Sequence, residues 1–105
     1  MLKEQKKLKM FKGLSFGSGV KGKDIVVFSR QLSVMITSNV PIVRALRVLV
    51  RQTENVTLKS IISDVADEVD GGAKLSQSLA KYPKVFGNFF IQMIRSAETT
   101  GRLDE

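Results

Sequence analysis

Three arginines recur at helical spacing near the middle of this chain. Arg44, Arg47 and Arg51 are three and four positions apart, so on a helix their guanidinium groups project from one side. Guanidinium groups pair with carboxylates through parallel hydrogen bonds, so this stripe could dock an acidic protein surface. The alternative is a solvated face paired with acids of the same domain, which is the commoner role of such charges.

A cluster of acids follows the arginine stripe. Asp64, Asp67, Glu68 and Asp70 lie near the predicted end of a helix, where carboxylates oppose the helix dipole and repel one another. A divalent cation such as calcium could relieve this repulsion with oxygen ligands from another helix or subunit. Against a cation site, the segment has no EF-hand-like loop, and solvated acidic faces are common.

The residue types that carry most catalytic chemistry are absent. The chain has no Cys and no His, which excludes disulfides, thiolate and imidazole catalysis and the usual zinc sites. The Gly-rich stretch 13–22 neither follows a predicted strand nor ends in the Lys-Ser/Thr pair of a phosphate loop. We therefore expect no enzyme and no cofactor.

Charge divides the chain into two parts. Residues 1–23 hold seven lysines against the single acid Glu4, a net charge of +6, and are predicted to form a basic, Gly- and Lys-rich linker. Residues 24–105 carry a net charge of only +1 and are predicted to form one domain. No stretch approaches the roughly 18 to 20 apolar residues that span a bilayer.

Apolar periodicity in residues 24–105 predicts an all-α fold, a small antiparallel bundle of short helices. Asp24 favours the start of the first helix, Asn39 and Pro41 separate it from the second, and Asn55 is the expected N-cap of the third. The five expected helices span about 24–37, 41–52, the segment from Asn55 to the Gly71-Gly72 pair, 76–81 and 88–100. The predicted inward-facing residues are Ile25, Phe28, Leu32, Met35, Ile36, Ile42, Ala45, Leu46, Leu49, Leu58, Ile61, Ile62, Val65, Val69, Leu75, Leu79, Phe90, Met93, Ile94 and Ala97.

Three blocks of residues, taken in order, resemble the type II secretion F protein family, which includes the platform proteins of type IV pili. The first block is Phe28-Ser29-Arg30-Gln31-Leu32 followed by Asn39-Val40-Pro41-Ile42-Val43-Arg44-Ala45-Leu46. The second is Gln52-Thr53-Glu54-Asn55 with Leu58, and the third runs from Gly72 through Leu75-Ser76 and Pro83-Lys84-Val85-Phe86 to Ser96-Ala97-Glu98-Thr99-Thr100-Gly101-Arg102-Leu103-Asp104. Each block alone is a weak match, but their order and spacing together are specific.

The resemblance implies a cytoplasmic domain of an inner-membrane scaffold, here five helices of an expected six. In the family a sixth helix and a transmembrane segment would follow Asp104, so we expect this domain to be incomplete at its C-terminus, with an exposed apolar groove that favours self-association. The motif positions with an expected structural role are Phe28, Gln31, Leu32, Pro41, Ala45, Leu46, Phe86, Gly101 and Leu103.

The implied function is to couple a cytoplasmic assembly ATPase to the movement of pilin or pseudopilin, at the cytoplasmic face of the bacterial inner membrane. Expected partners are that ATPase, other platform components, pilin or pseudopilin, a second copy of the chain, and an anionic membrane surface near the linker. No nucleic acid is expected. The candidate partner-contact residues are Arg30, Arg44, Arg47, Arg51 and Glu98. A structural role is favoured for Arg30, Gln31, Arg95 and Glu98, as polar groups that fix the register of the helices.

A different class of function is a small basic helical protein that binds nucleic acid. The lysine-rich linker and the arginine stripe would neutralise phosphates, and binding to duplex DNA would weaken steeply as salt rises. Against this, the predicted domain is almost neutral and contains no recognisable motif that reads DNA or RNA. A hydrolase or transferase would need a nucleophile with its base, which the missing His and Cys leave unsupported.

Overall fold

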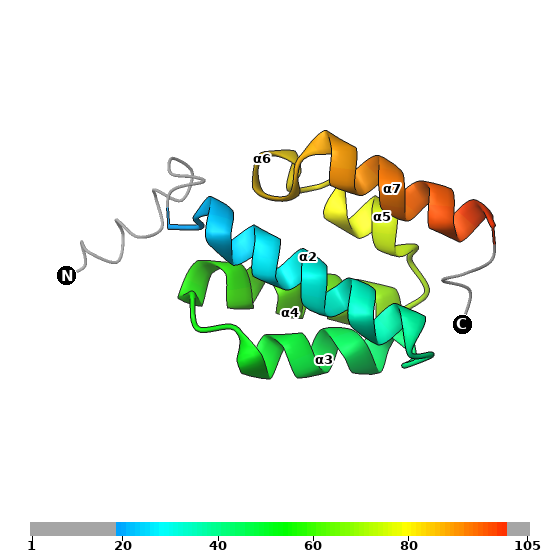
Figure 1. The fold of residues 1–105 in the computed structure, drawn as a ribbon, viewed down its shortest axis with the longest axis horizontal. Coiled ribbons are helices and arrows are strands. Elements are labelled where there is room, and N and C mark those ends of the chain that lie inside the picture. Colours follow the sequence, from blue (N-terminus) through cyan, green and yellow to red (C-terminus); the bar gives the residue numbers. More distant parts are fainter. Residues whose placement is uncertain (1–18, 101–105) are drawn as a thin grey trace.

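The computed structural model describes residues 19–100, and within that range the chain folds into α-helices with no strand (Figure 1). The helices are α2 (Gly22–Thr37), α3 (Ile42–Gln52), α4 (Val56–Asp70), α5 (Leu75–Leu79), α6 (Pro83–Phe86) and α7 (Asn88–Thr99). The predicted all-α class is confirmed. None of these helices is long and apolar enough to cross a bilayer. Residues 1–18 of the predicted linker lie outside the described residues, as do Gly101 and Leu103.

Most helix boundaries follow from local chemistry. Asn39 adopts the left-handed conformation, with φ of 65°, and turns the chain between α2 and α3. The Asn55 side chain accepts a hydrogen bond from the Leu58 amide over 2.9 Å, which is the expected N-cap of α4. After α4 the chain turns at Gly72, whose φ of 112° is strained for other residues. These turn and cap predictions are confirmed.

The region between α5 and α7 differs from the prediction. The helix expected over 76–81 is shorter, and a further one-turn helix, α6, lies between it and Asn88, where no helix is predicted. Pro83 begins α6 because its fixed φ suits the first position of a helix. Gly87, with φ of 84°, then separates α6 from α7. The proline that was expected to end the fourth helix therefore starts a further one.

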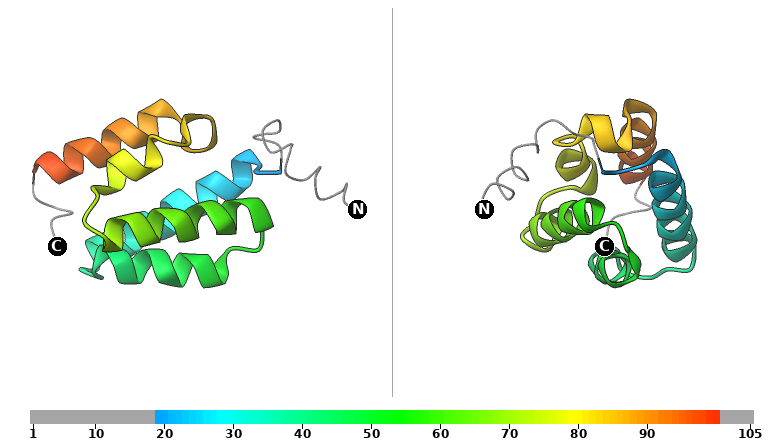
Figure 2. Two further views of the ribbon diagram at one scale, coloured as in Figure 1. Left: turned by 180° about the vertical axis from the view of Figure 1, so that it is seen from behind. Right: turned by 90° about the vertical axis from the view of Figure 1, so that its left-hand side faces the viewer.

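Neighbouring helices run antiparallel around a common core. In Figure 1, α2, α4 and α7 run in one direction along the molecule, and α3 and α5 run in the opposite direction. The most extensive packing is between α3 and α4; α2 also packs on α3, α4 on α5, and α5 on α7. Viewed from one end, the helices surround a shared interior (Figure 2). The predicted small antiparallel bundle is confirmed.

Every residue predicted to face inward is buried or half-buried except Met93 on α7, and Ala66 on α4 is buried in addition to the predicted stripe. Met93 was expected to face inward, but 47% of its surface is exposed, whereas Ile91 is buried. The prediction was wrong because α7 packs on α5 through a face rotated toward Ile91, and the periodic pattern alone could not fix that rotation. The buried apolar residues are Phe28, Leu32, Ala45, Leu46, Leu49, Leu58, Ile62, Val65, Ala66, Leu75, Leu79, Phe86, Phe90, Ile91 and Ile94.

Three buried phenylalanines join the first described helix to the last two. The ring centroid of Phe28 on α2 lies 5.5 Å from that of Phe86 on α6 and 6.2 Å from that of Phe90 on α7. The Phe86 and Phe90 centroids are 6.3 Å apart. Tilted and edge-on pairs at these separations add to the stabilisation from burial. This aromatic triangle closes the bundle.

The Asn55 cap predicts a stability effect. The side-chain oxygen of Asn55 caps α4. The side-chain nitrogen donates to the Gly19 carbonyl and lies 3.3 Å from the Asp24 carboxylate, so Asn55 also connects the start of α2 to α4. Replacing Asn55 with Ala should lower the free energy of unfolding by about 1 to 2 kcal/mol. Urea denaturation followed by circular dichroism measures the change. Asn88→Ala is the matched control, with an expected change within about 0.5 kcal/mol because Asn88 is exposed.

Candidate partner-binding face

Helix α3 has a buried side and a charged side. Ala45, Leu46 and Leu49 are buried in the core, while Arg44 and Arg51 are exposed. These two arginines are separated by about two helical turns, so their side chains lie on the same side of α3. We call the outer side of α3 that carries Arg44 and Arg51 the α3 arginine face.

Arg47 has intramolecular partners. One terminal nitrogen of its guanidinium group lies 2.9 Å from an Asp67 carboxylate oxygen, and the other lies 3.7 Å from Asp70. The side chain of Arg47 is 37% exposed, that of Asp67 65% and that of Asp70 64%, so water and salt screen these pairs. Arg44 and Arg51 form no ion pair with any residue in the range 19–100. The predicted arginine stripe therefore divides into one paired and two unpaired members.

The acidic cluster at the end of α4 is largely paired with cations of the same chain. Besides the two aspartates that Arg47 contacts, Glu68 accepts a hydrogen bond of 2.5 Å from the Lys81 ammonium group. This bond holds the pKa of the Glu68 carboxyl below its ordinary value, and the nearby Ser78 hydroxyl contributes in the same direction. Asp64 is exposed. Among the described residues, no group of three or more His, Cys, Asp or Glu side chains could hold a metal ion.

Glu98 connects α7 to the start of α5. Its half-buried carboxylate accepts hydrogen bonds from the Ser76 amide, over 2.8 Å, and from the Ser76 hydroxyl, over 2.6 Å. Ser76 is itself buried, in the first turn of α5, where backbone N–H groups have no acceptor within the helix. Both Glu98 oxygens are thus used within the domain, as expected for a residue that fixes the register of the helices.

The remaining motif residues are divided between surface and core. Arg30 is exposed on α2, and the neighbouring Gln31 is half-buried beside a cavity of about 220 Å³ between α2 and the junction of α3 with α4. Pro41 directly precedes α3. The buried motif positions are Phe28, Leu32, Ala45, Leu46 and Phe86.

The surface of α7 carries an apolar feature that was not predicted from the sequence. Phe89 is 80% exposed, and Met93, one helical turn further on, is also exposed. The sequence did contain a signal, because Phe89 directly precedes the core residue Phe90 and consecutive helical side chains point about 100° apart. Only one of the two rings could lie at the centre of the buried face.

Comparison with known proteins gives a consistent set of matches. The model of the family described as Type II secretion system (T2SS), protein F, matches residues 28–105. Type IV pilus assembly protein PilC of Thermus thermophilus is 39% identical over 82 residues, which cover 78% of this chain and 20% of that protein. PilC of Myxococcus xanthus is 36% identical over 86 residues, which cover 82% of this chain and 21% of that protein. Type II secretion system protein F of Vibrio cholerae is 33% identical over 92 residues, which cover 88% of this chain and 23% of that protein. The chain thus spans about a fifth of the length of these curated relatives.

The contact between Glu98 and Ser76 predicts a loss of stability on mutation. Glu98→Ala leaves the buried amide and hydroxyl of Ser76 without their acceptor, which should lower the free energy of unfolding by about 1 to 3 kcal/mol in urea denaturation. Glu98→Gln keeps one acceptor oxygen and should lose less. Glu54→Ala, which removes an exposed carboxylate, is the control. Equal stability of the Glu98→Ala and unmodified chains would contradict the role given to this contact.

The ion pairs of Arg47 predict a smaller, salt-dependent effect. Arg47→Ala should lower the free energy of unfolding by at most about 1 kcal/mol, because the pairs are exposed. The difference should shrink in high salt, where surface charges are screened. Arg44→Ala, measured in the same way, should leave stability unchanged in low and high salt. A larger, salt-independent loss for Arg47→Ala would mean that its aliphatic packing matters more than its charge.

Proposed function

Because the chain belongs to the type II secretion system protein F family, we propose that it forms part of the inner-membrane platform of a type IV pilus or type II secretion machine. Family membership carries this proposal, since the family model matches residues 28–105 and curated relatives are named as pilus-assembly and secretion proteins. In this role the domain is a scaffold at the cytoplasmic face of the membrane. It couples an assembly ATPase to the movement of pilin or pseudopilin through protein contacts, without catalysis of its own.

The α3 arginine face is the surface we propose for the contact with the ATPase or with a neighbouring platform subunit. Arg44 and Arg51 are exposed and have no carboxylate partner among the described residues. Each guanidinium group can bind a partner carboxylate through two parallel hydrogen bonds. Two such groups on one rigid helix give a defined spacing, which favours one docking orientation over others. Arg47 lies between them along the helix and is paired with Asp67. It therefore adds charge to this surface but makes little direct contact with a partner.

Two further contacts belong to the same proposal. The lysines of the N-terminal segment suit the anionic headgroups of the cytoplasmic leaflet, to which each basic residue near the surface adds attraction. Arg30 is exposed on α2 and offers an additional cation to a protein partner. Because salt screens both contacts, their contribution should fall as ionic strength rises.

Charge reversal on α3 tests the proposed contact. In the full-length protein, produced in cells that lack the native copy, Arg44→Glu with Arg51→Glu places like charges against an acidic partner. We expect pilus assembly or secretion to fall by at least about tenfold, with less ATPase recovered alongside the protein by affinity purification, because like-charge contacts are strongly unfavourable. The amount of protein in the membrane should be unchanged.

A matched control separates this contact from total charge. Lys59→Glu with Lys84→Glu makes the same change in net charge at exposed positions on α4 and α6, and should leave activity intact. If both double variants lose activity equally, the α3 arginine face is not the contact. If removal of the whole protein leaves assembly and secretion unaffected, the platform role itself is wrong.

A further inference from the structure

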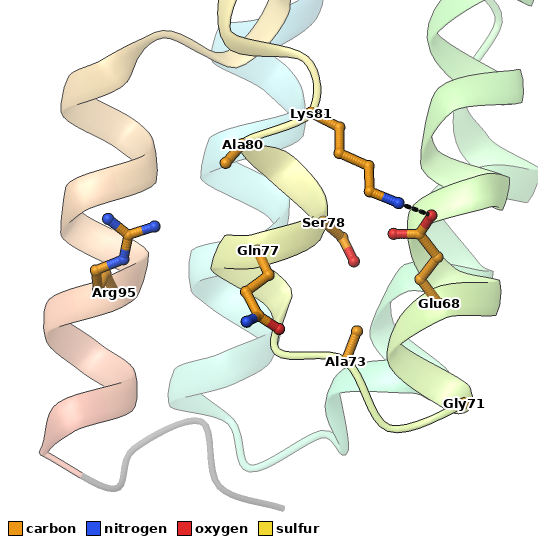
Figure 3. Close-up of a pocket in the computed structure, with 8 residues that line it drawn as sticks. All are labelled: Glu68, Gly71, Ala73, Gln77, Ser78, Ala80, Lys81 and Arg95. Atoms are coloured by element: carbon orange, nitrogen blue, oxygen red, sulfur yellow. Dashed lines mark hydrogen bonds and ion pairs between the residues drawn. The ribbon is translucent and has the colours of Figure 1, made fainter.

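An open cavity of about 620 Å³ lies where α4, α5 and α7 meet, away from the outer side of α3. Glu68 lines it from α4, Gln77 and Ser78 from α5, Lys81 from the segment after α5, and Arg95 from α7 (Figure 3). Arg95 lies on the opposite side of α5 from Glu68 and Lys81 in this view. The cavity therefore extends across α5 as a trough, and we call it the α5 trough.

Ser78 is the unusual residue in the trough. It is 1% exposed, and its hydroxyl oxygen has no hydrogen-bond partner among the described residues. The hydroxyl points into the space between α5 and α4, on the side of Glu68 (Figure 3), near enough to help lower the pKa of that carboxyl but outside hydrogen-bonding geometry. A buried hydroxyl without a partner costs free energy that alanine would avoid. A ligand that supplied an acceptor would remove this cost.

The other polar groups of the trough are mainly unused donors. The Lys81 ammonium group has three N–H bonds and gives one hydrogen bond, to Glu68. The Gln77 carbonyl oxygen accepts from the Lys74 amide, over 3.3 Å, so its NH₂ group remains available. Arg95 is exposed and forms no ion pair within residues 19–100. Such a surface fits a ligand rich in hydrogen-bond acceptors.

The charge and shape of the α5 trough limit which classes of ligand it could bind. The ionisable groups that line the trough are the cations Lys81 and Arg95 and the anion Glu68, so one added carboxylate would neutralise them. A doubly charged phosphate would meet repulsion from Glu68. Because the donors lie on both sides of α5, a single small ion could not reach all of them, whereas a peptide segment could. The pair of Lys81 with Glu68 lies over Ser78 but is exposed, and such pairs are weak enough to open.

We propose that the α5 trough binds an acidic peptide segment of a partner protein, with a carboxylate at Arg95 and an acceptor oxygen at Ser78. Arg95 can hold a carboxylate through two hydrogen bonds, which fixes its orientation. The Ser78 hydroxyl donates to a second oxygen of the segment once Lys81 moves aside. This site lies on other helices than the α3 arginine face and does not depend on the platform role.

Nuclear magnetic resonance titration of the isotope-labelled 105-residue chain with a capped oligoglutamate peptide tests the site. Amide shifts should change mainly in residues 73–81 and around Arg95. Arg95→Ala should weaken this binding by about tenfold, because it removes a charge-assisted contact. Arg51→Ala, the matched loss of an exposed arginine, should leave the affinity of the trough unchanged. A capped oligoglutamine peptide should not produce these shifts.

Ser78→Ala provides an independent readout. It should weaken oligoglutamate binding by about threefold, while the thermal midpoint of unfolding stays equal or rises, because an unpaired buried hydroxyl has been removed. A lower thermal midpoint would mean that the hydroxyl is bonded within the fold, and would overturn the proposal. Shifts centred on residues 44–51 would overturn it too. Equal binding of the oligoglutamine peptide would also overturn the proposal. Competition by inorganic phosphate as strong as that by the peptide would overturn it as well.

Discussion

The bundle depends on burying a helix too short to be stable alone. α5 has five residues, and helices of that length do not persist in water without tertiary contacts. Glu98 of α7 supplies the acceptor for the buried groups of Ser76 at the start of α5. Together with the packing of α7 on α5, this contact restricts how α7 can lie. The buried residues of α5 are Leu75, Ser76, Ser78 and Leu79.

The sequence was sufficient to predict features that depend on residues within about one helical turn. It was not sufficient to predict features set by contacts between residues far apart in the chain. The turn at Asn39 and the cap at Asn55 act within about one helical turn, so their residue types were sufficient. Met93 was misplaced because the buried side of α7 is set by its packing on α5, which periodicity does not describe. The partner of Glu98 lies 22 positions away, and no local pattern identifies it. The same holds for the Asp67 partner of Arg47, so the candidate site could be predicted only as a stripe of charges.

The arginine stripe and the acidic cluster, which are separate patterns in the sequence, form one arrangement in the fold. Arg47 and Lys81 neutralise acids near the end of α4, where the helix dipole disfavours negative charge. Within residues 19–100 only Arg47 and Lys81 form ion pairs, so most of the other cations there stay available to other molecules. Arg44 and Arg51 project from α3, and Arg95 projects from α7 beside the trough. The two arginines of α3 sit at a fixed spacing on one rigid helix, and such an arrangement favours a defined docking orientation.

The aromatic triangle has a consequence for how the domain assembles during synthesis. The hairpins of α2 with α3 and of α3 with α4 bring together segments close in sequence, so the loops that they close are short and form quickly. Phe28 meets Phe86 and Phe90 only when a loop of roughly sixty residues closes, which is slower. On the ribosome, the ring of Phe28 therefore lacks its aromatic neighbours until α6 and α7 have left the exit tunnel. The nascent chain therefore has an aromatic surface to protect until α7 emerges.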